Sequence, residues 1–296
     1  MNKIKILSAN FMFWLLIVLI GISTNSNAAE FKNHINGMYD AGGIKLHIEC
    51  YGDKSPSIIV QSGFNGYGSE DEWGAVIEKM SQKNRICIYD RAHMGKSDKL
   101  SKAYNINDIS EQLHTLLKNV DVKPPYIMVG HSYGSYPVKA YNHLYSSDVV
   151  GILLIDPSQY GQWSNRIAKW KPESEQYSKD QEADRLEELS YWNEPMKNIG
   201  FHDLKANEKI IKEADDFGDT PFVLLWAKNG IWTPGKDLGK NKVWTRMKNM
   251  YLKAIEDMNK LSTNMRVEFS RTTEHNIHFY EPETVIEQLN YLIAQQ

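Results

Sequence analysis

The sequence is poor in cysteine and has no surplus of positive charge. It contains 2 cysteines among 296 residues, so it has no set of thiolates spaced for a metal cluster. Its formal net charge is −3, and nothing in that balance suggests a nucleic-acid or anionic-membrane partner. Beyond the N-terminal segment no apolar run approaches the length of a membrane span. These absences argue against metal-cluster proteins, nucleic-acid-binding proteins and multi-span membrane proteins.

The long apolar run that the sequence does contain lies at its N-terminus. Lys3 and Lys5 precede it, residues 11–22 are almost wholly apolar, and residues 26–28 are small enough for cleavage. This order is typical of a secretory signal peptide, predicted here at residues 1–28, because an uncleaved membrane anchor needs a longer apolar stretch. Cleavage would remove both lysines and no acidic residue, so the formal net charge would move from −3 to −5. We expect a secreted or periplasmic protein with no stable membrane span after processing.

Apolar runs and amphipathic segments alternate along the rest of the chain. Strands are predicted at 36–40, 45–51, 57–61, 85–89, 126–130, 149–155, 221–226 and 265–270, and helices near 69–80, 109–120, 135–145, 241–261 and from 282 onward. Ser69 and Glu72 form the pattern of a capping box at the start of the first helix. Such alternation predicts a mostly parallel sheet with both faces covered. Residues 158–219 contain no convincing strand, which predicts a helical cap inserted between two parts of one core, 29–157 and 220–296.

One motif stands at a strand-to-helix junction in the middle of the chain. Gly130, His131, Ser132, Tyr133 and Gly134 fit G-x-S-x-G, the pattern of a nucleophile elbow. The serine at the apex must adopt a strained backbone to lift its hydroxyl clear of the sheet, and the flanking glycines remove Cβ atoms that would clash. The helix that follows directs unpaired N–H groups toward an oxyanion forming there. Ser132 is therefore the candidate nucleophile, and the alternative is a serine in an ordinary tight turn.

Further segments stand in a characteristic order around this motif. They are the glycine-rich loop 61–66, then Tyr89, Asp90 and Arg91 with Gly95, Ser97 and Asp98, and after the motif the segment 274–283. Together they resemble the α/β-hydrolase family, and within it the esterase-like and haloperoxidase-like group. The resemblance implies an α/β fold with a mostly parallel eight-stranded sheet, helices on both faces and a helical cap. It also implies a serine hydrolase that acts on a small-molecule substrate and needs no metal or organic cofactor.

The resemblance further implies that the catalytic base comes last in the chain. Of 9 histidines, this leaves His275 and His278. His275 has the spacing to Pro282 that the family's histidine loop shows, so it is the candidate base. His278 is interpreted as a loop residue packed on or near the site, and an exchange of the two roles stays open.

The acid that orients the base should lie between the serine and the histidine in the chain. Asp156 ends a predicted strand, which places its carboxylate at the edge of the sheet where ligands bind. Asp237 lies in the loop after the next strand, where residues 227–230 lack the family's usual Gly-x-x-Asp pattern. Asp156 is favoured for this reason, although an Asp-Pro pair also ends strands without any catalytic role. Asp90 and Arg91 precede the nucleophile and are interpreted as a structural pair that holds a loop.

Two backbone groups and a set of aromatic residues complete the expected site. The oxyanion would be bound by the backbone N–H groups of Tyr133, which follows the nucleophile, and Phe64. The predicted cap is rich in aromatic residues, among them Trp163, Trp170, Tyr191 and Trp192. They could line a pocket for a substrate with an apolar portion, or simply pack the cap onto the core.

The residues and the resemblance together favour a carboxylic-ester hydrolase that works through an acyl-enzyme. An aminopeptidase of the proline-releasing kind is the rival enzyme, and a hydrolase-fold protein that binds a ligand without turnover is the rival outside enzymes. A dehalogenase is not expected, because its chemistry places aspartate where Ser132 stands. The family's strand order makes the strands of Cys50 and Cys87 neighbours, so a cross-strand disulfide is a hypothesis beside that of two free core cysteines.

Overall fold

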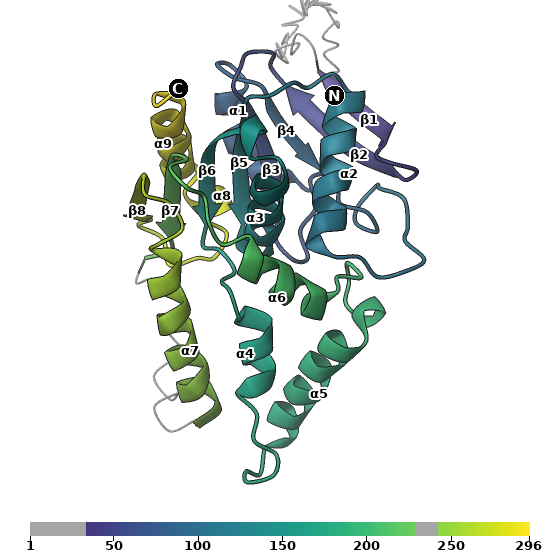
Figure 1. Ribbon diagram of the computed structural model, residues 1–296, viewed down its shortest axis with the longest axis vertical. Helices are drawn as coiled ribbons and strands as arrows, with labels where there is room; N and C mark the ends of the chain where they lie inside the picture. The colour runs from purple at the N-terminus through teal and green to yellow at the C-terminus, as the bar shows by residue number, and fades with distance from the viewer. Residues whose placement is uncertain (1–33, 229–241) are drawn as a thin grey trace, which may run out of the picture. The chain divides into compact units, whose positions relative to one another are not determined.

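A computed structural model describes residues 34–228 and 242–296, which are built around one eight-stranded sheet (Figure 1). The strands are β1 (Ile35–Asp40), β2 (Lys45–Tyr51), β3 (Ser57–Gln61), β4 (Ile86–Tyr89), β5 (Tyr126–His131), β6 (Val149–Ile155), β7 (Phe222–Trp226) and β8 (Met265–Phe269). Their order across the sheet is β1-β2-β4-β3-β5-β6-β7-β8. β2 pairs antiparallel with β1 and with β4, and the other pairings are parallel. The mostly parallel, eight-stranded sheet expected from the sequence is confirmed.

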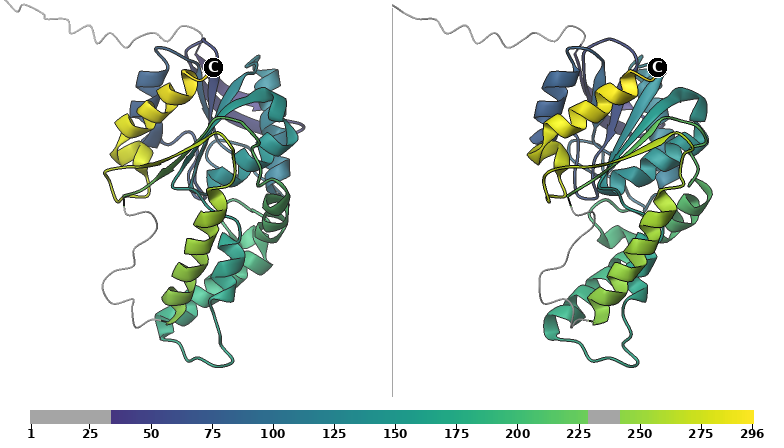
Figure 2. Two further views of the ribbon diagram at one scale, coloured as in Figure 1. Left: turned by 60° about the vertical axis from the view of Figure 1, so that its left-hand side comes forward. Right: turned by 90° about the vertical axis from the view of Figure 1, so that its left-hand side faces the viewer.

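Helices cover both faces of this sheet. They are α1 (Gly74–Met80), α2 (Ile106–Asn119), α3 (Ser135–Leu144), α4 (Gln162–Ala168), α5 (Lys179–Asn193), α6 (Leu204–Glu213), α7 (Lys242–Met258), α8 (Ile277–Tyr280) and α9 (Pro282–Ile293). α1 and α9 lie on one face and α2 and α3 on the other (Figure 2). Val60 of β3 belongs to one core with Val76 and Leu289, whereas its neighbour Ile59 belongs to the opposite core with Leu113. No helix in the described ranges is long and apolar enough to cross a membrane.

The helices that lie between β6 and β7 in the chain form a layer beyond the sheet. A helix from later in the chain, α7, packs against this layer. Within residues 158–219 the regular elements are helices, and none is a strand of the sheet, in agreement with the sequence. The sequence assigned α7 to the second part of the core, yet α7 packs against α4 (Figures 1 and 2). The guanidinium of Arg246 on α7 lies 2.6 Å from the carboxylate of Glu175, and its Nε donates to the Lys169 carbonyl at 2.7 Å. The limits of the cap as a separate domain stay a prediction.

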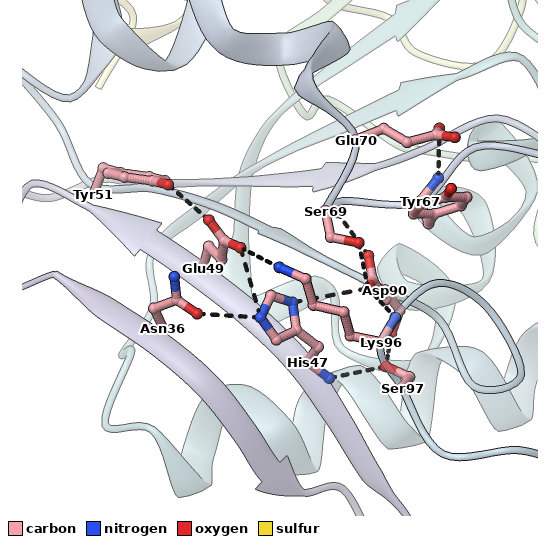
Figure 3. A network of polar contacts seen from close by, with 10 residues as sticks. All are labelled: Asn36, His47, Glu49, Tyr51, Tyr67, Ser69, Glu70, Asp90, Lys96 and Ser97. Atoms are coloured by element: carbon pink, nitrogen blue, oxygen red, sulfur yellow. Dashed lines mark hydrogen bonds and ion pairs between the residues drawn. The ribbon is translucent and has the colours of Figure 1, made fainter.

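The first helix on the sheet begins without the capping box that the sequence predicts. The hydroxyl and the N–H of Ser69 both donate to the carboxylate of Asp90 at 2.8 Å (Figure 3). The chain then passes through a 3-10 turn, Asp71–Trp73, whose start has no side-chain cap, before α1 begins. The prediction is wrong because a buried carboxylate at the end of β4 competes for the same serine hydroxyl. Sequence spacing within residues 69–72 could not reveal that distant partner.

A disulfide joins β2 to β4. Cys50 and Cys87 are directly opposite each other in the antiparallel register, with their Cα atoms 4.1 Å apart and a sulfur–sulfur distance of 2.11 Å. Both side chains are buried in the core. The cross-strand disulfide is therefore confirmed, and the alternative of two free core cysteines is wrong.

We expect removal of this disulfide to lower the stability of the protein. The bond closes a loop with a sequence separation of 37 residues. Replacing both residues, Cys50→Ala with Cys87→Ala, should lower the free energy of unfolding by about 2–4 kcal/mol, because the unfolded chain regains the entropy of that loop. Urea unfolding of the variant and of the oxidised wild type measures the difference. Two thiols titrating in the unreduced, unfolded wild type would contradict the disulfide itself.

Candidate active site

β5 ends in a sharp turn at Ser132. The backbone of this residue has a φ of +51°, in the left-handed region that residues with a side chain rarely occupy. A Cβ atom on Gly130 would lie 2.8 Å from the carbonyl oxygen of Gly134, and one on Gly134 would overlap the carbonyl of Gln61. The Ser132 carbonyl in turn accepts a hydrogen bond from the N–H of Ser158 at 3.0 Å. These close contacts with the backbone of Gln61, Gly134 and Ser158 hold the elbow in the conformation expected from the motif.

The two other candidates for the catalytic set contact each other. His275 Nδ1 lies 2.6 Å from Oδ2 of Asp156, and Oδ1 of Asp156 accepts from the N–H of Ala227 at 3.3 Å. A carboxylate can only accept, so Nδ1 of the neutral imidazole carries the proton and Nε2 offers its lone pair. Asp156 stands immediately after β6, and its φ of +39° means that the backbone leaves the extended conformation of the strand at this residue. The other candidate acid, Asp237, lies outside the described residues.

Ser132 and His275 line the same two cavities. Both line a cavity of about 290 Å³ together with Asp156, and a second cavity of about 370 Å³ together with Gly63. Within the described residues no hydrogen bond joins the serine to the imidazole, a separation common in catalytic sites without substrate. The structure brings the three residues predicted from the sequence to one place, and their catalytic roles stay predictions.

The loop that carries His275 is held in place by His131, His278 and Glu72. The Nε2–H of His131 donates to the carbonyl of His275 at 3.1 Å. Glu72 accepts from the amide of Asn276 at 3.3 Å and lies 3.4 Å from Nε2 of His278. Because His278 is fully buried and has Glu72 as its partner, it supports the loop, and of the two candidate bases it is His275 that lines the cavities. His131 could have been suspected from its place in the motif, whereas the sequence pointed to Glu72 only as part of a capping box and not as a partner of this loop.

Buried charges also hold the glycine-rich loop that follows β3. Arg91 donates through Nη1 to the carbonyl of Ser62 at 2.7 Å and through Nη2 to that of Gly63 at 2.5 Å. Asp90 binds Ser69, several residues farther along the same loop. Asp90 and Arg91 thus both hold the loop after β3, as expected from the sequence, and each binds a different stretch of it. Each bond leaves a buried charge with a partner, which burial requires.

The residues predicted to supply the oxyanion donors lie beside the serine. Phe64 and Tyr133 line one cavity together with Ser132. The two aromatic rings pack edge to face, with their centroids 5.3 Å apart. This contact ties the glycine-rich loop to the elbow, and the roles of the two backbone N–H groups stay predictions.

The cavity that these two residues line extends into the cap and has a volume of about 620 Å³. Trp163, Trp170 and Tyr191 of the expected aromatic set line it, and Trp163, Tyr191 and Trp192 also pack into the core. Its wall also carries charged residues, namely Arg166, Lys169, Asp184, Glu187 and Glu188. The wall is therefore mixed in character, and an apolar portion of the substrate stays a prediction. Among residues 34–228 and 242–296 no cluster of three or more histidine, cysteine, aspartate or glutamate side chains could hold a metal ion.

Comparison with known proteins agrees with this geometry. The family model described as alpha/beta hydrolase fold matches residues 56–183, the segment that contains the elbow and Asp156. The chain has the α/β-hydrolase fold. The esterase EaEST from Exiguobacterium antarcticum superposes on this α/β-hydrolase with a TM-score of 0.60, covering 87% of this chain and 99% of that one. At 13% sequence identity, this likeness shows the fold alone.

Sequence relatives cover a smaller part of this α/β-hydrolase. The uncharacterized protein YqjL of Bacillus subtilis strain 168 is 32% identical over 122 residues, which are 40% of this chain and 47% of that protein. The 2-hydroxy-6-oxo-6-(2'-aminophenyl)hexa-2,4-dienoic acid hydrolase of Metapseudomonas resinovorans is 26% identical over 134 residues, 45% of each chain. The chain thus spans about half the length of these curated relatives.

Burial of His131 in this α/β-hydrolase has a consequence for stability that can be measured. Burial lowers the pKa of His131 well below its ordinary value of 6.5, which the ring regains in the unfolded chain. The unfolded state therefore binds more protons below that pH, and the free energy of unfolding falls as the pH falls. We expect this one residue to lower the free energy of unfolding by roughly 1 kcal/mol in total between about pH 7 and about pH 5.5, measured by urea unfolding, with the slope approaching about 1.4 kcal/mol per pH unit only at the acidic end.

A matched variant isolates this contribution. His131→Gln keeps a side-chain N–H that can donate to the His275 carbonyl but cannot titrate. Its stability should therefore fall less steeply with pH than that of the wild type. Other histidines with lowered pKa values, such as His202 and His278, contribute equally to both proteins and cancel in the comparison. Identical slopes in the two proteins would contradict the assignment.

Proposed function

We propose that this α/β-hydrolase is a serine hydrolase that cleaves a carboxylic ester through an acyl-enzyme. The observation that carries the proposal is the 2.6 Å contact between His275 Nδ1 and Asp156, beside cavities that His275 shares with Ser132. A nucleophile, a base and a group that orients the base are the parts that acyl transfer requires. The name of the Metapseudomonas relative as a hydrolase and that of the Exiguobacterium protein as an esterase add support for this class of reaction.

In the proposed reaction Ser132 Oγ attacks the ester carbonyl while Nε2 of His275 takes the hydroxyl proton. The oxyanion that forms accepts hydrogen bonds from the backbone N–H groups of Tyr133 and Phe64. His275 then gives its proton to the leaving alcohol as the C–O bond breaks, which leaves the acyl group on Ser132. A water molecule deprotonated by His275 then attacks the acyl-enzyme. His275 returns that proton to Ser132 Oγ as the bond between Oγ and the acyl carbon breaks, which releases the carboxylic acid and restores the enzyme. Asp156 holds the imidazole in the required tautomer and stabilises its protonated form.

We further propose that the protein is exported, with the signal peptide at residues 1–28 removed. The N-terminal pattern of two lysines, an apolar run and small residues motivates this proposal. The disulfide between Cys50 and Cys87 supports it, because disulfides persist in oxidising compartments. Mass spectrometry of the protein recovered outside the cytoplasm tests it, since a chain that retains residue 1 would contradict cleavage.

A proline-releasing aminopeptidase is the second candidate, and one observation favours it. Such an enzyme needs acidic residues for the substrate's ammonium group, and Asp184 and Glu187 of α5 line the large cavity with Ser132. Aryl esters compared with aminoacyl arylamides separate the two functions by the ratio of their kcat/KM values. An ester hydrolase should favour the former, and the aminopeptidase would favour the latter.

Loss of the nucleophile should abolish turnover. We expect Ser132→Ala to lower kcat for a p-nitrophenyl ester by at least about 10⁴-fold, because the acyl-enzyme cannot form. A fluorophosphonate probe should label the wild type on Ser132 and leave this variant unlabelled. A wild type that folds and resists both the ester and the probe would instead favour a ligand-binding protein without turnover.

The identity of the acid can be decided by two matched substitutions. Asp156→Asn should lower kcat by about 10³- to 10⁴-fold, because an amide at this position no longer favours the tautomer with a free Nε2. Asp237→Asn makes the same chemical change at the alternative position. Equal or larger losses at Asp237 would transfer the role to that residue.

A further inference from the structure

Arg166 occupies a particular place among the charged side chains near Ser132. It projects from α4 and lines both the cavity of about 620 Å³ and the cavity of about 290 Å³ that contains Asp156 and His275. Ser132 lines both cavities as well. Among the described lining residues, Arg166 is the charged side chain that the two cavities share. A substrate group held there would lie close to the bond that is cleaved.

The guanidinium of Arg166 is held in place by packing. Its central carbon lies 5.0 Å from the centroid of the Trp163 ring, at a distance suited to cation–π stacking. The side chain is 30% exposed, so part of it stays accessible from the cavities. A guanidinium stacked in this way loses little further freedom when it binds a ligand.

The positive charge of Arg166 is only weakly neutralised by the protein. Its contact with Glu188 is long, at 3.5 Å. That carboxylate is already engaged by the Lys169 ammonium and by the Trp170 indole N–H, each at 2.7 Å. The buried Nε of Arg166 has no hydrogen-bond partner, and the hydroxyl of Tyr251, a further polar neighbour of the guanidinium, is neutral at physiological pH because burial raises its pKa. The cation therefore retains hydrogen-bonding capacity and charge for a ligand.

The remaining acidic residues of the cap are less well placed to compete. Asp184 and Glu187 line the larger cavity but are absent from the wall of the smaller one that contains His275. Glu187 also accepts a hydrogen bond from the Tyr191 hydroxyl at 2.7 Å. Apart from Asp156 and His275, Arg166 is thus the charged side chain that lines the cavity of about 290 Å³, whereas the carboxylates Glu70 and Glu72 line the separate cavity of about 370 Å³.

We propose that Arg166 binds a carboxylate of the substrate, so that the preferred substrates are esters carrying a second, free carboxylate. This inference rests on the proposed ester hydrolysis and specifies its substrate class. A guanidinium offers two parallel N–H groups to a carboxylate, and such charge-assisted bonds are stronger than neutral ones. Arg166 acts as a specificity-determining residue in this arrangement and takes no part in the transfer of protons.

The test compares matched anionic and neutral esters. One pair varies the acyl half, p-nitrophenyl hydrogen succinate against p-nitrophenyl butyrate, and a second varies the leaving group, 3-carboxyphenyl acetate against phenyl acetate. We expect the wild type to favour the anionic member of at least one pair in kcat/KM by about 10-fold or more. Arg166→Gln should lower kcat/KM for that ester by about 10- to 100-fold and leave the neutral ester within about 3-fold.

Two controls guard against a merely structural effect of the substitution. Arg185→Gln makes the same change on α5, where the arginine pairs with Glu182 and does not line the cavities, and it should keep the anionic preference. Arg166→Lys keeps the charge and should retain part of the preference. If Arg166→Gln does not fold, the wild type still decides, because the anionic preference should shrink as salt is added while turnover of the neutral ester stays constant.

The outcomes separate the inference from the function on which it rests. Hydrolysis of neutral esters with no anionic preference, or a preference that survives in Arg166→Gln, overturns the carboxylate site and leaves the hydrolase intact. A preference for aminoacyl substrates overturns it in favour of the acidic residues Asp184 and Glu187. Failure to hydrolyse any ester, together with failure of the fluorophosphonate probe to label Ser132, overturns both proposals.

Discussion

The left-handed backbone at Ser132 is the constraint on which the rest of the site depends. Such a conformation costs roughly 1–3 kcal/mol for a residue with a side chain and persists only where its surroundings allow no other. Here the absence of a Cβ atom on Gly134 lets the turn press against the carbonyl of Gln61, at the end of β3. The same contact fixes how the elbow meets the loop that follows β3. A change in either strand end would therefore move the nucleophile and its neighbours together.

Strand order explains why distant segments converge on this turn. β5 lies between β3 and β6, and all three run parallel, so their carboxyl ends reach the same edge of the sheet. β3 delivers the loop with Phe64, β5 delivers Ser132, and β6 delivers Asp156. His275 arrives from beyond β8 and is held by the carboxylate of Asp156 on one side and by His131 on the other. The geometry of the candidate site is thus largely a property of the parallel sheet.

Buried polar groups hold the loops around this edge in place. Asp90, Arg91 and Glu72 each bind a segment far away in the chain. Asp90 and Arg91 line none of the cavities at Ser132, whereas Glu72 is partly exposed and lines the cavity of about 370 Å³. A buried charge without a partner is costly, so the buried residues Asp90 and Arg91 each strongly favour the one arrangement of the loop that satisfies them. This network supports the nucleophile and base without entering the chemistry, in the same way that outer residues orient the ligands of a metal site.

Sequence reasoning succeeded where the signal was local and failed where it depended on a remote partner. The strands and the elbow follow from short apolar runs and glycine spacing, which act within a few residues. The capping box at Ser69 was wrong, because Asp90 takes that hydroxyl from 21 residues away. The place of α7 beside α4 and the role of Glu72 were missed for the same reason. Arg166 resembled any other cation of a helical segment until its position beside Ser132 was known.

By itself, the sequence determined the order of strands and helices, the strained turn with its serine, and the two cysteines that could pair. Each of these depends on backbone preference and side-chain spacing, which are properties of short stretches of chain. Only the tertiary structure decided that His275 rather than His278 faces the cavities, that Asp156 meets its imidazole, and which charges border the nucleophile. Those choices depend on which surfaces meet when the strands pair and the helices pack onto the sheet. The contacts concerned join residues more than a hundred positions apart, so no local sequence pattern reveals them.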